Sequence, residues 1–189
     1  MDYDRVEKSL QAVIDATIPL STAQKGRIRQ ACEGLLLAGS SQLAWIARWL
    51  PQTSTKDSRI KWLARILEAE YVSQERVYAP FVKQILKHYA PAVLHLAMDR
   101  TVWTEHETDL LSLSLNFRQR AIPIAWEFMP NGMSNYERQQ ALIRTSLSLL
   151  PEGIPVIFHG DNEFGSVRLM QYLQALGWDF IVGQSSKNY

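Results

Sequence analysis

Two stretches, Val93-Leu-His-Leu-Ala-Met-Asp99-Arg-Thr and Pro155-Val-Ile-Phe-His-Gly-Asp161-Asn-Glu, decide the fold predicted for this chain. Each contains an apolar run of the length expected for a buried strand, and an aspartate follows each run. The open sheets of α/β proteins gather their functional groups where strands leave the core. Two carboxylates in that position favour a bound cation, because carboxylates that share a site repel one another.

The composition is that of a folded globular protein. Of the 189 residues, 47% are hydrophobic, which is enough for a sizeable core. No apolar run reaches the roughly 18 residues of a membrane-spanning helix, and the start Met1-Asp-Tyr-Asp lacks the pattern of a signal peptide. Cys32 is the single cysteine, which excludes an internal disulfide and disfavours a zinc site. We expect a cytoplasmic protein with no membrane partner.

The net charge of +1 hides a difference between the two halves of the chain. Residues 1–90 carry 13 Lys and Arg against 9 Asp and Glu, a net +4, and residues 91–189 carry 7 against 10, a net −3. The first half therefore favours partners that carry phosphate groups, whereas the second gathers carboxylates.

Periodicity separates the same two halves. Up to about residue 90 the apolar residues recur at helical spacing, and Pro91 ends the pattern. Asp57 or Ser58 can cap one of these helices, and another is predicted over 73–89. Residues 1–90 are therefore predicted to form an all-α domain.

Beyond residue 91 the apolar pattern changes to that of strands alternating with helices. Ser134 and Glu137 have the spacing of a capping box and predict the start of a helix. The predicted elements, in the order βββαβαβ, are 93–98, 110–117, 121–129, 134–150, 155–160, 165–176 and 178–182.

This element order restricts the topology. Three consecutive strands favour an antiparallel meander, and a right-handed crossover then places the fourth strand beside the first and parallel to it. The sequence thus predicts an α/β fold with a mixed sheet in strand order 3-2-1-4-5. Asp99 and Asp161 become neighbours in this arrangement. Their hard oxygen ligands favour Mg²⁺ or Mn²⁺.

The segments Leu96-Ala-Met-Asp99-Arg-Thr-Val-Trp103, Ala121-Ile-Pro-Ile-Ala-Trp126 and Gly160-Asp161-Asn-Glu-Phe-Gly-Ser166 resemble the catalytic domain of DDE transposases of bacterial insertion sequences. The resemblance implies a ribonuclease-H-like catalytic domain over 91–189, preceded by a DNA-binding domain over 1–90. It also implies cutting and joining of transposon ends by metal-dependent phosphoryl transfer, and therefore an association with the nucleoid.

In such a site Asp99 would bridge two metal ions, Mg²⁺ or Mn²⁺, and Asp161 would bind one of them. The resemblance implies a third ligand, a glutamate on a later helix, which would lie beyond Tyr189. We therefore expect a C-terminally truncated and inactive form of the catalytic domain. Glu163 could replace the missing ligand, or it could stabilise the positive end of the following helix.

The expected partner of the helical half is DNA at the transposon ends. Candidate phosphate contacts come from two basic clusters. The first consists of Lys25, Arg27 and Arg29, for which a solvated face is the alternative, and the second consists of Lys61 and Arg65. Trp45, Trp49 and Trp62 could stack on bases, but their helical spacing favours the core. The resemblance further implies a homodimer on DNA, or a heterodimer with a full-length transposase.

Two other functions compete with this one. A haloacid-dehalogenase-like phosphatase also has an aspartate after an apolar strand, but it needs a second aspartate where this chain has Thr101. A non-catalytic fragment that binds DNA or inhibits transposition remains open. Arg100 could neutralise a substrate phosphate, or it could pair with a nearby carboxylate such as Glu105 or Glu107.

Overall fold

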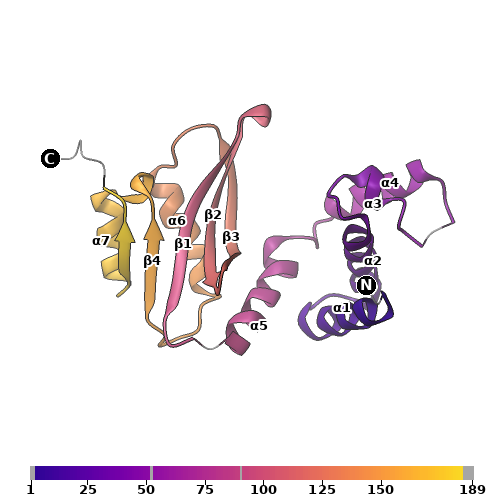
Figure 1. Cartoon of the computed structure of the whole chain (residues 1–189), viewed down its shortest axis with the longest axis horizontal. Coiled ribbons are helices and arrows are strands. Elements are labelled where there is room, and N and C mark those ends of the chain that lie inside the picture. Colours follow the sequence, from indigo (N-terminus) through magenta and orange to yellow (C-terminus); the bar gives the residue numbers. More distant parts are fainter. Residues whose placement is uncertain (1–2, 52, 90, 185–189) are drawn as a thin grey trace. The chain divides into compact units, whose positions relative to one another are not determined.

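The structure is a computed structural model that describes residues 3–51, 53–89 and 91–184 (Figure 1). It divides into two compact units, Met1–Gln84 and Ile85–Tyr189. The division falls within the helix Ala79–Tyr89, whereas the sequence pattern changes at residue 91. Within the described ranges, the helices are too short or too polar to cross a membrane.

The first unit is helical, and its apolar residues form two clusters. Ile14, Ile18 and Ile28 are the buried centre of one cluster. Ile46, Leu50 and Leu63 belong to the other. The elements are α1 Tyr3–Thr17, α2 Thr22–Ala38, α3 Leu43–Ile46, α4 Lys56–Leu67, the π-helical turn η1 Gln74–Tyr78 and the start of α5 Ala79–Tyr89.

Short polar residues set the starts of these helices. Ser21 caps α2 and forms a capping box with Gln24. Thr55 caps α4, and its side-chain oxygen accepts the N–H of Ser58 at 3.3 Å. The prediction that Asp57 or Ser58 caps this helix was wrong, because both lie inside its first turn and only Thr55 has the extended backbone of a cap.

The second unit contains a five-stranded mixed sheet in the order β3-β2-β1-β4-β5, which confirms the predicted ribonuclease-H-like strand order. Strands β1, β2 and β3 pair antiparallel, β4 runs parallel to β1, and β5 runs parallel to β4. The strands are β1 Leu94–Trp103, β2 Thr108–Phe117, β3 Arg120–Pro130, β4 Val156–Gly160 and β5 Asp179–Val182, and the helices are η2 Thr104–His106, α6 Tyr136–Leu147, η3 Asn162–Phe164 and α7 Val167–Ala175.

The two faces of this sheet differ. Figure 1 shows α6 and α7 behind the sheet, on the face that carries the buried Leu94, Leu96 and Met98 of β1. Alternation along the strand turns His95 and Asp99 to the opposite face, and both are exposed. We call these the covered face and the open face. The predicted carboxylates therefore lie outside the hydrophobic core that positions them.

Candidate metal-binding site

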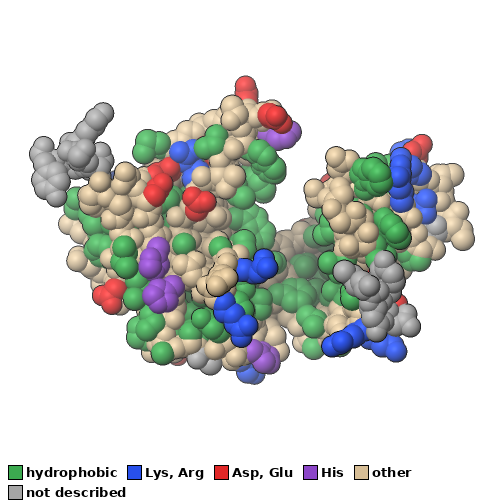
Figure 2. Space-filling model, viewed as in Figure 1, with side chains coloured by type: hydrophobic (Ala, Val, Ile, Leu, Met, Phe, Trp, Pro, Cys, Tyr) green, Lys and Arg blue, Asp and Glu red, His purple; other side chains and the backbone are tan. Residues whose placement is uncertain are grey.

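Asp99 lies within β1, and Asp161 directly follows β4, the strand that pairs with β1 in parallel. Ala97 of β1 is in register with His159 of β4, and Asp99 and Asp161 each come two residues later. The strands run parallel, so at this register Asp99 is on the open face in the middle of β1, and Asp161 is level with it at the carboxyl end of β4. The prediction that Asp99 follows its strand was wrong, because β1 continues to Trp103 through its pairing with β2. Figure 2 shows acidic side chains toward the upper end of this face and histidines below them. The topology thus makes neighbours of two segments that each carry an aspartate and are far apart in sequence.

A tight turn after β4 orients Asp161. Its Oδ1 accepts the backbone N–H of Glu163 at 2.8 Å, so Asp161 caps η3. Gly160 permits this turn, because a Cβ there would lie 2.7 Å from the Cβ of Phe164, a buried side chain. Asp161 is therefore an exposed carboxylate on a constrained backbone.

The donors at this place suit Mg²⁺ or Mn²⁺, because both ions prefer carboxylate oxygens and keep several of their waters. However, no group of three or more His, Cys, Asp and Glu side chains in the described ranges is arranged to hold a metal ion. Within those ranges, Asp99 and Asp161 therefore form a pair that lacks a third protein ligand.

Arg100 lies beside Asp99 in sequence but points to the covered face. Its Nε donates to Glu163 Oε2 at 2.7 Å, and its Nη1 donates to Asp109 Oδ2 at 2.8 Å. Of the two alternatives from the sequence, pairing with a carboxylate is the one observed, but the partners are Asp109 and Glu163 in place of Glu105 or Glu107. The reason is that strand alternation turns Arg100 inward, toward carboxylates from β2 and η3.

Ser134 completes this network through Glu163. Glu163 Oε1 accepts the Ser134 N–H at 2.8 Å and the Ser134 hydroxyl at 2.6 Å. Because this contact occupies Ser134, Asn135 caps α6 in its place and accepts from the N–H of Arg138, so the predicted capping box was wrong. Glu163 is bonded through both carboxylate oxygens on the covered face, which leaves it unsuited to be the missing metal ligand.

The network keeps its carboxylates ionised. Burial raises the pKa of Glu163, but hydrogen bonds from Ser134 and Arg100 outweigh it and leave that pKa below its usual range. Burial also raises the pKa of Asp109, but the hydrogen bonds from the Gly132 N–H and from Arg100 outweigh it. The pKa of Asp109 is therefore below its usual range. Sequence reasoning missed Asp109, which belongs to no motif, and gave Ser134 a different role, because the partners of both come from distant segments.

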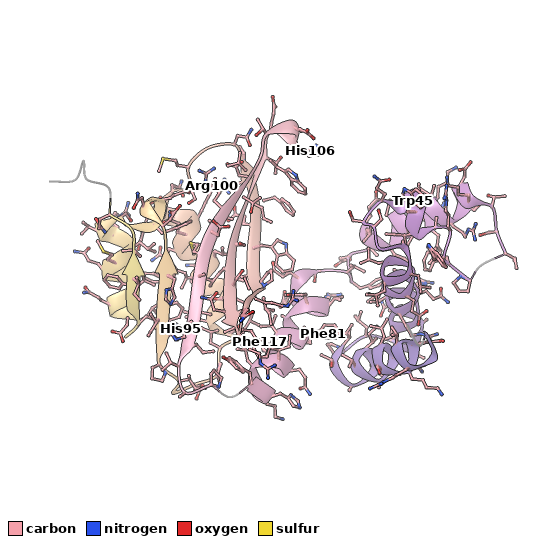
Figure 3. All side chains as sticks on the ribbon, viewed as in Figure 1. Trp45, Phe81, His95, Arg100, His106 and Phe117 are labelled. Carbon is pink, nitrogen blue, oxygen red and sulfur yellow. The ribbon has the colours of Figure 1, made fainter. Side chains whose placement is uncertain are left out.

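Two histidines lie on the open face near the aspartates. His95 Nδ1 and His159 Nε2 are 2.9 Å apart, so one nitrogen donates and the other accepts. Burial, and then the charge of His95, lower the pKa of His159. Figure 3 labels His95 on the lower part of β1 and Arg100 toward its upper end.

The predicted DNA-binding residues divide into two groups. Arg29 pairs with Glu7 at 2.9 Å and lies 3.6 Å from Glu33, and Lys25 donates to the carbonyl oxygen of Asp15 at 2.8 Å. The remaining three have exposed side chains: Arg27, Lys61 and Arg65. Only three of the five candidate DNA-binding side chains are therefore exposed to solvent.

Two tryptophans of the helical unit are exposed, although the sequence predicted them in the core. Trp45 is 46% exposed and Trp49 is 49% exposed. The guanidinium of Arg48 lies 4.1 Å from the ring centroid of Trp45, within the range of a cation–π contact. Trp62 is partly buried and packs against the cluster of Ile46 and Leu63. Helical spacing alone did not separate these three environments.

No family model matches the sequence, and no curated protein matches it either. Among solved structures, the chain is similar to a piggyBac transposase in a cryo-EM structure of its synaptic complex with hairpin DNA. The TM-score is 0.40 and the identity is 15%, over 96% of this chain and 48% of that chain. The chain thus spans about half the length of that transposase chain. A similarity at this TM-score carries no functional assignment.

Proposed function

We propose that this chain is a DDE-type DNA transposase, or part of one, in which Asp99 and Asp161 bind the divalent cations of phosphoryl transfer. The observation that supports this most strongly is the parallel register of β1 and β4, because Asp99 and Asp161 each come two residues after the registered pair Ala97 and His159 and both are exposed. Core aspartates would be expected to have local partners, and surface aspartates would be expected to lie apart. These two belong to neighbouring parallel segments, and Asp161 stands on a constrained backbone.

Each aspartate would have a definite task in such a site. Asp99 and Asp161 would both hold the divalent cations through their carboxylate oxygens. Mg²⁺ or Mn²⁺ held there would polarise the scissile phosphate and make water or a 3′-hydroxyl a better nucleophile. The contribution of this chain would be to hold both carboxylates in position on neighbouring segments of the sheet before any substrate binds.

The helical unit would hold DNA mainly through electrostatic contacts. Lys25, Arg27, Arg29, Lys61 and Arg65 are the proposed contacts, and each phosphate they neutralise releases counterions. An assembly with two protein copies on the transposon ends is part of the same proposal.

A second candidate function is a non-catalytic one, and the carboxylate pair itself favours it. A two-ion site needs more protein ligands than the pair supplies, and no group of three is found in the described residues. We therefore propose that residues 1–189 alone bind one hydrated cation weakly and leave DNA uncut. Such a chain could still bind DNA and inhibit transposition.

The test is a titration of the purified chain with Mn²⁺, following the free ion by electron paramagnetic resonance. Asp99→Asn and Asp161→Asn should each weaken binding about tenfold or more, because each removes a charged ligand. Asp179→Asn is the matched control, since Asp179 is an exposed aspartate on β5 of the same sheet. Equal Mn²⁺ binding by all four proteins would contradict the proposed site.

The cleavage part of the proposal has its own assay. The chain is incubated with supercoiled plasmid and Mn²⁺ beside its Asp99→Asn variant, and no nicking is expected from either. Nicking by the parent alone would mean that a third ligand is present, and the non-catalytic candidate would then be wrong.

A further inference from the structure

We propose that Arg100 and Glu163 are positioning residues that hold Asp99 and Asp161 in register for cation binding. This inference rests on the proposed function of the two aspartates. It concerns residues on the face of the sheet opposite to the proposed site. The ion pair of Arg100 and Glu163 would thus have a role in metal affinity as well as in folding.

The ion pair joins the two backbone segments that carry the aspartates. Arg100 directly follows Asp99 on β1, and Glu163 is the second residue after Asp161. Arg100 Nε and Glu163 Oε2 are 2.7 Å apart, and their side chains are only 19% and 9% exposed. At the other end of the bridge, the backbone N–H of Glu163 donates to Asp161 Oδ1 at 2.8 Å. Glu163 therefore contacts both Arg100 and Asp161.

Further contacts hold this bridge in one position. Arg100 also bonds Asp109 of β2, which is fully buried and accepts the N–H of Gly132 at 3.1 Å. Ser134 bonds the second oxygen of Glu163 through its hydroxyl and its N–H. A guanidinium with two carboxylate partners loses rotational freedom, so the positions of β1 and η3 become coupled.

Arg100 cannot act as a ligand or as a direct contact to substrate phosphate in this arrangement. Adjacent residues of a strand face opposite sides of the sheet, so Asp99 is on the open face and Arg100 is on the covered face. Arg100 can influence an ion at Asp99 only through the backbone or through its charge. These two routes have opposite signs, which makes them separable.

The charge route predicts tighter cation binding when Arg100 is removed, because a positive charge near the cation is lost. The positioning route predicts weaker binding, because the two aspartates lose their common anchor. Mutation of residues that orient metal ligands typically costs about 10- to 100-fold in affinity. We expect about a tenfold weaker Mn²⁺ affinity for Arg100→Gln, opposite in direction to the effect of charge alone.

The experiment measures Mn²⁺ affinity of the full chain by electron paramagnetic resonance for the parent, Arg100→Gln, Arg100→Lys, Asp99→Asn and Arg168→Gln. Circular dichroism at the same temperature confirms that each variant is folded. Arg100→Lys keeps the charge but can reach fewer carboxylate oxygens, so its affinity should be intermediate. Arg168 is the control, because its pair with Glu137 is exposed on both sides and lies on α7 and α6.

The outcomes distinguish the two proposals. Weaker binding by Arg100→Gln, partial rescue by Arg100→Lys and no change in Arg168→Gln would support positioning. Unchanged or tighter binding by folded Arg100→Gln, with binding lost in Asp99→Asn, would overturn positioning and leave the metal site intact. Absence of Mn²⁺ binding by the folded parent would overturn the metal site, and the positioning role with it. If Arg100→Gln does not fold, the comparison of Arg100→Lys with the parent decides, and unchanged affinity overturns positioning.

Discussion

The charged residues of the sheet unit and those of the helical unit are held in different ways. Arg100 is fixed by two carboxylates from different elements in a network with little exposure to water. Arg29 pairs with Glu7, whose side chain is 54% exposed, and Arg27, Lys61 and Arg65 are open to solvent. Buried charges must be paired, because an unpaired one loses its hydration without compensation. Charge therefore supports the fold in one unit and remains available for binding in the other.

Substitution of Arg100 and of Arg29, one in each unit, should give the largest difference in the free energy of unfolding. Arg100→Met keeps the apolar stem but leaves Asp109 and Glu163 buried without their cation, and we expect a loss of about 3 kcal/mol in the free energy of unfolding. Arg29→Met should cost less, about 1 kcal/mol, because its hydrogen-bonded partner Glu7 is more than half exposed and Glu33 lies farther away, at 3.6 Å. Urea denaturation monitored by hydrogen exchange would assign each loss to its unit. Similar losses for both variants would remove the contrast.

DNA affinity should show the reverse contrast. The triple variant Arg27→Ala, Lys61→Ala, Arg65→Ala should bind duplex DNA about tenfold more weakly at low salt, with a shallower salt dependence, because solvent-exposed cations can reach phosphates. Fluorescence anisotropy over a salt series measures both quantities.

The matched control for DNA binding is the double variant Lys25→Ala, Arg29→Ala. These cations already contact Asp15 and Glu7, so their loss should weaken DNA binding less than the triple variant does. A larger effect of the double variant would show that DNA displaces the protein contacts of Lys25 and Arg29. The contrast between cations paired within the protein and cations exposed to solvent would then be lost.

The smallest expected effect concerns the histidine pair on the open face. The pKa of His159 is lowered in the folded state by burial and by His95, so protonation favours the unfolded chain. Stability associated with His159 should be present above the unfolded pKa of about 6.5 and should fall as the pH drops below that value. Thermal unfolding at pH 7.5 and pH 5.5 measures this change, and His159→Gln should reduce it. An unchanged pH dependence in His159→Gln would assign the effect to other groups.

Much of the fold could be predicted because its main signals are local. The apolar runs that contain Leu94 to Met98 and Val156 to Phe158 became β1 and β4, and the connection rules gave their parallel pairing. Helix starts were harder, since several polar residues competed at each one. Thr55 and Asn135 became the caps in place of Asp57 or Ser58 and of Ser134.

The sequence by itself determined the element order, the strand order and the parallel pairing of β1 with β4, because hydrophobic periodicity and chain connectivity are properties of the chain. Only the tertiary structure decided the partners of Arg100 and Glu163 and the exposure of Trp45 and Trp49. A long side chain such as that of Arg100 can reach carboxylates that are near or far in the sequence. Which partner they bind depends on the packing of distant elements, since burial makes a paired charge favourable only where its counterion is also enclosed.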